Sequence, residues 1–281
     1  FDTPHVPDDN RLANYLRKPD WQGVEGDLEW LQQEGCHLLT IHDPHYPTPL
    51  RELPDAPPLL FLRGSPEVLA NPQLAMVGSR NPTAAGKRTA SDFAKHMSNS
   101  GITITSGLAR GIDGASHAGA LATNNPTIAV VGTGLDKVYP ARHHQLAVNI
   151  SETGALVSEF SLGTPPIEIN FPKRNRIISG LSIGTLVVEA ALESGSLITA
   201  HMAIEQNREV FAIPGSINNP LSKGCHKLIR EGAKLVESTH DILEELAPLC
   251  ELNITHVDQS ITDDKEVGPC NTEHHDDFLH N

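Results

Sequence analysis

Short apolar runs recur along the chain from residue 73 onward, each followed by a glycine-containing turn and then by a stretch with helical periodicity. This alternation is typical of βαβ units, in which parallel strands form a sheet and helices cover its faces. The runs occupy residues 74–77, 102–105, 127–131, 155–158, 184–188 and 209–213. Six buried strands predict an α/β fold with a doubly wound, mostly parallel sheet.

Helical periodicity fills the intervals between these runs. The expected helices occupy residues 83–99, 114–123, 174–181, 197–206 and 223–231. Strands and helices together predict one large domain at residues 73–249.

The two flanks differ from this domain in composition. Residues 1–43 contain a short amphipathic stretch at 27–33 that ends at Gly35, which we interpret as the end of a small N-terminal helical module. Residues 44–72 contain eight prolines, a density that predicts an irregular connector packed along the sheet. Residues 250–281 are acidic and lack periodic apolar positions, which predicts a flexible tail.

Composition narrows the classes of function. Hydrophobic residues make up 38% of the 281 residues, and no run approaches the roughly 20 apolar residues of a membrane helix. The first residues lack the basic and apolar regions of a signal peptide, so we expect a cytoplasmic protein without a membrane partner. The four cysteines form no C-x-x-C pair, and neither histidine pair has the spacing of a metal face. We therefore expect no disulfide framework and no metal site.

The net charge of -14 is distributed unevenly. Residues 1–75 carry 12 acidic and 5 basic side chains, and residues 236–281 carry 12 acidic and 1 basic. Residues 76–235 carry 11 acidic and 15 basic side chains, a net charge of +4. The central segment is therefore suited to bind a polyanion locally, although the whole chain is acidic.

The turn after the first apolar run contains Gly78, Ser79 and Arg80. It lacks the glycine spacing of a dinucleotide fingerprint and of a P-loop, so neither NAD nor ATP chemistry is expected. A strand-to-helix turn of this composition offers backbone N–H groups, a hydroxyl and a guanidinium to a phosphate. The alternative is that Arg80 is a solvated loop residue without a ligand.

A second cluster lies at residues 170–176, at the entry to a predicted helix. Its three cations, Lys173, Arg174 and Arg176, oppose the helix dipole unless an anion binds there. Phe171 stands beside them, and an aromatic ring next to cations is the pairing used to stack on bases of single-stranded nucleic acids. Burial of Phe171 in the core is the alternative.

Ligands of open α/β sheets bind outside the carboxyl ends of the strands, and Arg110 lies in another turn that follows a predicted strand. We therefore expect Arg80, Arg110 and the cations at 173–176 to converge on one crevice. No nucleophile has a convincing base: Ser196 and His201 are five residues apart on a predicted helix, which is outside hydrogen-bond reach. We assign no catalytic residue.

Taken together, these motifs resemble those of the DNA-processing protein A family (DprA, also called Smf), and the resemblance covers residues 76–246. It rests on residues 77–80, 106–113, 132–136 with 139–140, 171–181, 195–199 and 211–215. The resemblance implies an extended Rossmann-like domain that binds single-stranded DNA in natural transformation, protects it and helps load the RecA recombinase. It also implies a homodimer without enzymatic activity and without a cofactor.

The resemblance also implies which residues form the DNA site: the Gly78–Arg80 turn with the three cations of the second cluster, Phe171 for stacking, and Asn175 as a further candidate. Combined with the sheet argument, the predicted DNA-binding residues are Gly78, Ser79, Arg80, Arg110, Phe171, Lys173, Arg174, Asn175 and Arg176. Ile229 and Leu235, near the last strand, are the expected dimer contacts. The winged-helix-like domain that often follows in this family does not fit in the acidic tail.

A nucleotide-binding phosphoribohydrolase is the alternative function. Residues 180–189 partly repeat the P-G-G-x-G-T-x-x-E motif of the lysine-decarboxylase-like superfamily, with Glu189 as acid and base and Arg176 as phosphate ligand. Release of a free base from a nucleoside monophosphate would distinguish this function from DNA binding. A purely structural oligomerisation module would have neither activity.

Overall fold

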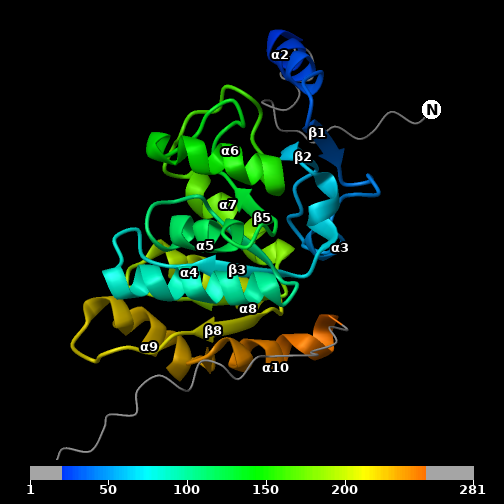
Figure 1. Ribbon diagram of the computed structural model, residues 1–281. Helices are drawn as coiled ribbons and strands as arrows, with labels where there is room; N and C mark the ends of the chain where they lie inside the picture. Colours follow the sequence, from blue (N-terminus) through cyan, green and yellow to red (C-terminus); the bar gives the residue numbers. More distant parts are fainter. Residues whose placement is uncertain (1–20, 251–281) are drawn as a thin grey trace, which may run out of the picture.

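A computed structural model describes residues 21–250 of the chain. Nine strands form one sheet in the order β1-β2-β6-β5-β4-β3-β7-β8-β9 (Figure 1). Their bounds are Cys36–Thr40 (β1), Leu59–Gly64 (β2), Gln73–Val77 (β3), Thr103–Ser106 (β4), Thr127–Val130 (β5), Ala155–Ser158 (β6), Gly184–Val187 (β7), Glu209–Ala212 (β8) and Lys234–Leu235 (β9). Strands β3 to β9 are parallel, whereas β2 pairs antiparallel with both β1 and β6.

The helices follow the strands in the order expected for a doubly wound fold. Their bounds are Trp21–Leu31 (α2), Thr48–Arg51 (α3), Ala84–Asn99 (α4), Ile112–Leu121 (α5), His144–Thr153 (α6), Asn170–Leu181 (α7), Gly195–Glu205 (α8), Lys223–Arg230 (α9) and Thr239–Cys250 (α10). Short 3-10 turns lie at Pro66–Ala70 (η1), Ala141–His143 (η2) and Pro220–Ser222 (η3). All six predicted strands and all five predicted helices are present, which confirms the α/β fold class.

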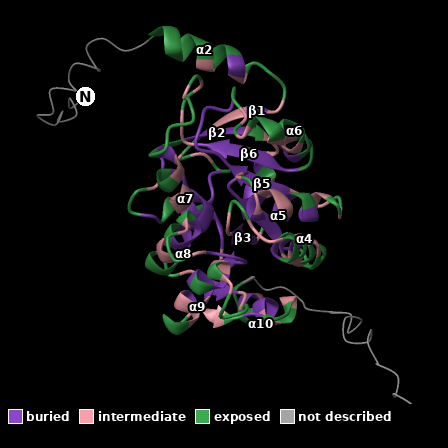
Figure 2. Cartoon of the chain, turned by 90° about the vertical axis from the view of Figure 1, so that its left-hand side faces the viewer, coloured by how far each residue is buried: buried purple, intermediate pink, exposed green. Residues whose placement is uncertain are grey.

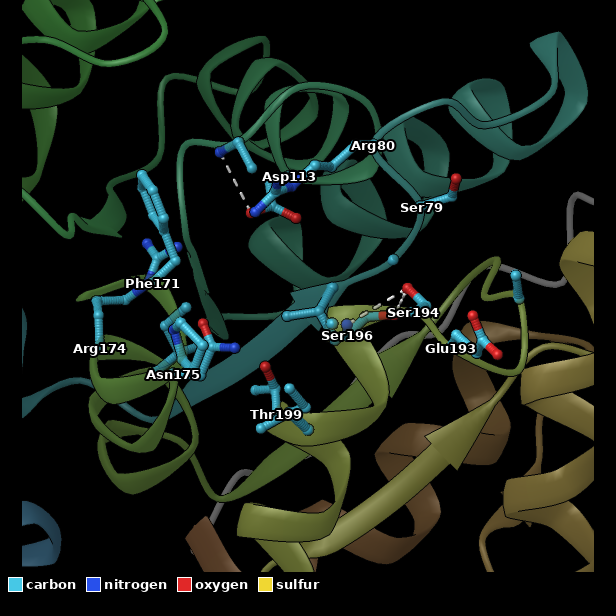
Figure 3. Close-up of a pocket in the computed structure, with 18 residues that line it drawn as sticks. Ser79, Arg80, Asp113, Phe171, Arg174, Asn175, Glu193, Ser194, Ser196 and Thr199 are labelled. Atoms are coloured by element: carbon cyan, nitrogen blue, oxygen red, sulfur yellow. Dashed lines mark hydrogen bonds between the residues drawn. The ribbon is translucent and has the colours of Figure 1, made fainter. Parts of the chain in front are cut away.

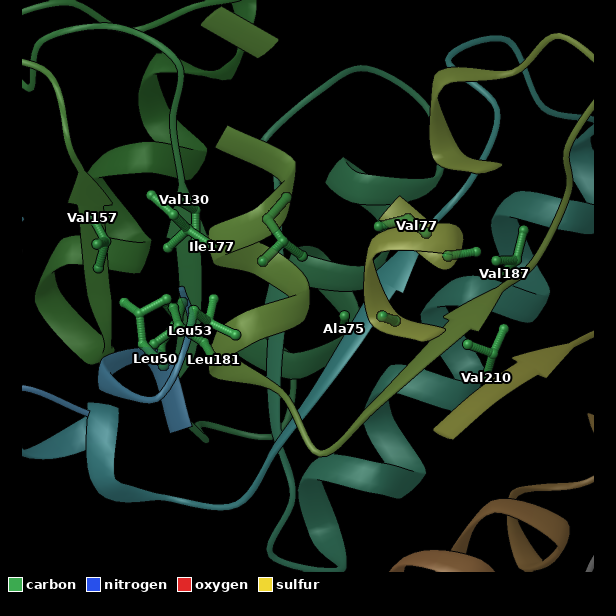
Figure 4. Close-up of a cluster of buried hydrophobic side chains, with 14 of the residues drawn as sticks. Leu50, Leu53, Ala75, Val77, Val130, Val157, Ile177, Leu181, Val187 and Val210 are labelled. Atoms are coloured by element: carbon green, nitrogen blue, oxygen red, sulfur yellow. The ribbon is translucent and has the colours of Figure 1, made fainter. Parts of the chain in front are cut away.

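Alternating side chains of the strands supply two apolar layers. Ala75 and Val77 of β3 pack with α3, α7, α8 and α9, whereas Leu74 and Met76 of the same strand pack with α4, α5 and α10. Figure 4 shows the first layer, in which Ile177 and Leu181 of α7 lie near Leu50 and Val130. Helix α6 packs on the second side through Ala147 and Ile150. The sheet is therefore covered on both faces, and Figure 2 shows it buried between helices with exposed outer sides.

The proline-rich segment 44–72 differs from its prediction as an irregular connector. Residues 59–64 form β2, and this strand is an integral part of the sheet because it pairs with β6 on one side and β1 on the other. Leu60 and Leu62 are fully buried there. The prolines lie before and after the strand, where they remove no ladder hydrogen bond, so their density did not prevent strand formation.

The flanks are described in part. Helix α2 overlaps the helix expected at 27–33, but it begins earlier, at Trp21, and ends at Leu31. The tail predicted at 250–281 lies outside the described residues, apart from its first residue at the end of α10. None of the described helices is long and apolar enough to span a membrane.

Candidate functional site

A cleft of about 510 Å³ opens at the carboxyl ends of β3 and β7. These two strands are neighbours, and the chain order reverses between them, which is the switch point where open α/β sheets bind ligands. Figure 3 shows residues of α7 on one side of the cleft and the turn before α8 on the other. The polar and aromatic lining residues are Ser79, Arg80, Asp113, Phe171, Arg174, Asn175, Glu193, Ser194, Ser196 and Thr199.

The turn after β3 is built against the start of α5 and the end of β7. The backbone N–H of Ser79 donates to the carbonyl of Glu189 at 2.6 Å, and the N–H of Ile112 donates to the carbonyl of Ser79 at 3.2 Å. A Cβ at Gly78 would lie 2.6 Å from Cγ1 of Ile112 and 2.9 Å from the oxygen of Glu189. Only glycine fits this approach, so the turn projects Arg80 at a fixed place on the rim.

An exposed cation and two aromatic rings form a row at the rim of the cleft. The guanidinium carbon of Arg80 lies 5.7 Å from the ring centroid of Phe171, within the range of a cation–π contact. The ring of Tyr139 lies 5.6 Å from the ring of Phe171. Phe171 is half-buried and lines the cleft, so it is not a core residue. Stacking, the first of the two interpretations of Phe171, is compatible with this position.

Arg174 is buried in the wall of the cleft. Its guanidinium donates to the carbonyl of Gly107 at 2.8 Å and to the carbonyl of Val130. Burial lowers the pKa of Arg174 to about 10, and the neighbouring Asp113 counteracts this shift. Burial raises the pKa of Asp113, which accepts hydrogen bonds from the N–H groups of Gly107 and Ala109. The pair ties the ends of β4 and β5 to α7.

The other predicted cations lie outside the cleft. Arg176 forms ion pairs with Asp55 at 2.9 Å and with Glu159 at 2.6 Å, which tie α7 to the loops after α3 and β6. Lys173 and Arg110 are exposed and do not line the cleft. The cleft therefore brings together six of the nine predicted residues, which are Gly78, Ser79, Arg80, Phe171, Arg174 and Asn175.

The prediction omitted Tyr139 and the start of α8. The hydroxyl of Ser194 caps α8 by accepting from the N–H of Ser196 at 3.4 Å, and the two hydroxyl oxygens are 2.7 Å apart. The one sequence feature that could have identified the start of α8 was the position of its turn after a buried strand. The turn at 193–196 carries no cation or aromatic ring, so composition did not distinguish it from an ordinary loop.

Glu189 and Arg176, the pair of the alternative hydrolase function, both have structural partners. The carboxylate of Glu189 accepts from the N–H of Thr83 at 2.8 Å and from its hydroxyl at 2.7 Å, at the N-terminus of α4. Neither Glu189 nor Arg176 lines the cleft. Within residues 21–250, no group of three or more His, Cys, Asp or Glu side chains is arranged to hold a metal ion.

Comparison with known proteins identifies the family. The family model described as DNA recombination-mediator protein A matches residues 37–247. The chain belongs to this family. Protein Smf of Escherichia coli (strain K12) is 52% identical over 237 residues, which are 84% of this chain and 62% of that protein. The chain therefore spans less than two thirds of the length of that relative.

Two solved structures of DNA recombination-mediator protein A family members share the fold. DNA processing protein A from Streptococcus pneumoniae superposes with a TM-score of 0.77 at 42% identity, covering 83% of this chain and 81% of that one. The protein from Helicobacter pylori superposes with a TM-score of 0.69 at 28% identity, covering 76% of this chain and 97% of that one. Its structure is described as giving insight into a single-stranded DNA binding mode. The resemblance inferred from the motifs is thereby confirmed.

Proposed function

We propose that the cleft binds single-stranded DNA through phosphate contacts and base stacking. The observation that carries this proposal is the contact of the Arg80 guanidinium with the ring of Phe171 at the rim of a cleft on the carboxyl edge of the sheet. Exposed cations beside aromatic faces are the combination that binds single strands without reading their sequence. The single-stranded DNA binding mode ascribed to the Helicobacter pylori relative supports the same ligand class.

The chemistry of the cleft divides between phosphate and base. The guanidinium of Arg80 and the hydroxyl of Ser79 are donors for a phosphate, and the first N–H groups of α8 add the positive end of a helix dipole. Phe171 offers a face that accepts any base, so we expect weak sequence preference. Bases in a duplex are already stacked and paired, so single strands should bind more tightly than duplexes.

Fluorescence anisotropy with single-stranded and duplex oligonucleotides at two salt concentrations tests this proposal. Arg80→Ala should weaken binding to every sequence and flatten the log-log salt dependence by about 0.7, the value for one phosphate on a single strand. Lys173 is exposed beside the lining residues Pro172 and Arg174 but does not line the cleft itself, so Lys173→Ala should have a smaller effect of the same kind. Phe171→Ala should weaken single-strand binding by about 5- to 150-fold, which corresponds to the loss of one stacked base.

The matched control is Lys95→Ala. Lys95 is a partly exposed cation in the second half of α4, its ammonium is 3.8 Å from the carboxylate of Asp92, and it is not part of the cleft lining. Its removal changes the net charge as much as Arg80→Ala does and should leave affinity nearly unchanged. Equal affinities of the native protein, Arg80→Ala and Phe171→Ala would contradict the assignment of the cleft.

The wider role is proposed from family membership. It comprises action in natural transformation in the cytoplasm, protection of incoming single strands and help in loading RecA, without catalysis by this chain. Protection is tested by nuclease digestion of a bound single strand. Loading is tested separately by the assembly of RecA filaments on DNA, with ATP hydrolysis as the readout. Arg80→Ala should reduce both effects together if they depend on DNA held in the cleft.

A homodimer is the second part of this proposal. Strand β9 is at the edge of the sheet, and Leu235 on it has 44% of its surface exposed. Ile229 on the neighbouring α9 is partly buried and packs against the core, so it has less surface to offer a partner. An exposed apolar residue on an open edge strand favours association with a second copy.

A further inference from the structure

The rim row continues beyond the cleft onto a surface that the cleft does not include. We propose that this surface, formed by Tyr139, Arg142 and Arg110, is a second subsite that binds the nucleotides next to the one in the cleft. This inference rests on the proposed function, since it concerns the path of the same single strand.

Two loops hold Tyr139 and Phe171 in place before any ligand binds. Gly134, after β5, donates its N–H to the carbonyl of Thr164 at 3.1 Å, and Gly163, after β6, donates its N–H to the carboxylate of Asp136 at 2.9 Å. The ammonium of Lys137 also donates to the carbonyl of Gly163. Tyr139 follows the first loop and Phe171 follows the second, so these bonds join the segments that precede the two rings, whose centroids are 5.6 Å apart.

The close approach of the two loops depends on a missing side chain. A Cβ at Gly134 would lie 2.7 Å from the carbonyl oxygen of Ser161 and 2.9 Å from Cα of Leu162. Tyr139 as a whole residue nevertheless has 50% of its surface exposed. An aromatic ring held in solvent by a fixed loop loses little conformational entropy on stacking, which favours binding.

The surface next to Tyr139 carries unpaired positive charge. Arg142 lies in η2, and the ring nitrogen Nδ1 of His143 is 2.9 Å from the carbonyl of Leu108, so η2 packs against the turn that carries Arg110. Both arginines are exposed, and within the described part of the chain neither forms an ion pair or a hydrogen bond. Both guanidinium groups are therefore free to contact phosphates.

Acidic groups are scarce on this surface, although the chain as a whole is acidic. The sequence between Lys137 and Glu152 contains no Asp or Glu. The nearest carboxylate on the Arg110 turn, that of Asp113, is buried and accepts two backbone hydrogen bonds. The ring of Tyr139 beside free guanidinium groups repeats the combination of Phe171 and Arg80 at the rim of the cleft. One polyanionic strand with stacking bases fits both the cleft and this second surface.

Binding of short and longer oligothymidylates separates the two subsites. A trinucleotide fills the cleft alone, whereas a strand of about eight nucleotides, within the usual site sizes of single-strand binding folds, also reaches the second subsite. Tyr139→Ala should weaken binding of the longer strand by about 5-fold or more and leave the trinucleotide unaffected. The double variant Arg110→Ala/Arg142→Ala should lower the salt slope for the longer strand only. Tyr139→Phe, which retains the ring, should bind as the native protein does.

The outcomes distinguish this inference from the proposed function. Arg80→Ala should weaken both oligonucleotides, and its failure to do so would contradict DNA binding in the cleft. In a second outcome, Arg80→Ala weakens binding of both oligonucleotides while Tyr139→Ala and the double arginine variant weaken neither. That result would support DNA binding in the cleft and refute the second subsite. Equal losses on both lengths would refute it too, because Tyr139 would then act inside the cleft. Photocrosslinking of an iododeoxyuridine strand to the intact protein should label Tyr139, and labelling of Phe171 alone would also oppose the subsite.

Discussion

Three cations within four residues of α7 have three different environments. Lys173 is exposed, Arg174 is buried in the cleft wall, and Arg176 pairs with acidic residues away from the cleft. An α-helix turns by about 100° per residue, so adjacent cations cannot share one face. The sequence indicated a cation-rich helix start correctly, and helix geometry alone separates Arg174 from Lys173 and Arg176, which are three residues apart and could share one face. The partners of Arg176 are far away in the sequence, so no local pattern identified them.

Arg174 and Lys173 should respond to substitution in opposite ways. Arg174→Met removes the donors to two carbonyls and leaves Asp113 as an uncompensated buried carboxylate, which should cost about 3 kcal/mol or more of unfolding free energy. Lys173→Ala should change stability by less than about 0.5 kcal/mol. Urea denaturation measures both variants. A stable Arg174→Met protein would contradict the structural role of this buried arginine.

His117 should make stability depend on pH. It is fully buried, its Nδ1 lies 2.8 Å from the hydroxyl of Thr127, and burial lowers its pKa from 6.5 to about 3. Between these values the unfolded chain binds a proton that the folded protein excludes, so this contribution to stability is complete above about pH 6.5 and declines below it. At pH 5 the loss is about 2 kcal/mol, from about 1.4 kcal/mol per pH unit.

The comparison with His117→Asn isolates this effect, because all other groups titrate in both proteins. Urea denaturation at pH 7.5 and pH 5 should show the native protein losing about 2 kcal/mol more than the variant over this interval. Equal losses in the two proteins would mean that His117 is protonated in the folded state.

At the scale of elements, the central strands were predictable because each is buried on both faces and reads as an apolar run. Strand β2 has such a run in Leu60, Phe61 and Leu62, but the surrounding prolines masked it. Strands β1 and β9 are at the edges of the sheet, where composition constrains a strand less. The position of the cleft was predictable from the sheet topology, because its main loops come after the neighbouring strands β3 and β7. Tyr139 lies next to the cleft through a contact with the ring of Phe171, 32 positions away in the sequence, which no local pattern encodes.

The start of α4 gives a test of the alternative hydrolase function. Glu189 is 9% exposed and its carboxylate accepts two hydrogen bonds from Thr83 at this helix end. Glu189→Gln keeps the shape of the side chain but makes it a weaker hydrogen-bond acceptor for Thr83. We therefore expect a loss of about 1–3 kcal/mol in unfolding free energy and an unchanged affinity for single-stranded DNA. Denaturation and anisotropy measure these two quantities.

The same variant serves the enzymatic assay. Incubation of the native protein with nucleoside monophosphates should release no free base above the buffer rate. Release by the native protein that Glu189→Gln abolishes would establish Glu189 as a catalytic acid or base and reverse our preference for DNA binding.

At the scale of the whole molecule, charge and topology act together. The net charge of -14 argues against a nucleic-acid ligand only if it is averaged over the chain. The segment 76–235 has an excess of cations, and it supplies the end of β3, all of β4 to β9 and every lining residue of the cleft. The acidic excess lies in residues 1–75 and 236–281, which flank this segment. Binding should therefore be local and sensitive to salt.

The proposed homodimer gives the last prediction. Two clefts related by a two-fold axis would engage one strand together, and the effective concentration of the second cleft would raise avidity by about 100-fold or more. Leu235→Asp places a charge on the edge strand β9, where 44% of the leucine surface is exposed in one chain. Light scattering should give twice the chain mass of 30.4 kDa for the native protein and a single chain mass for this variant.

Leu28→Asp is the matched control, because Leu28 on α2 is similarly exposed at 55% and α2 lies at the opposite end of the molecule from β8, the neighbour of β9 in the sheet (Figure 1). It should remain dimeric. In the native protein and in the control, affinity for single strands should rise with oligonucleotide length. In Leu235→Asp the steepest part of this rise should disappear, because one cleft with its adjoining subsite covers few nucleotides. A native protein of about 30 kDa at micromolar concentration, with the same length dependence as Leu235→Asp, would refute the dimer and leave a monomeric binding module.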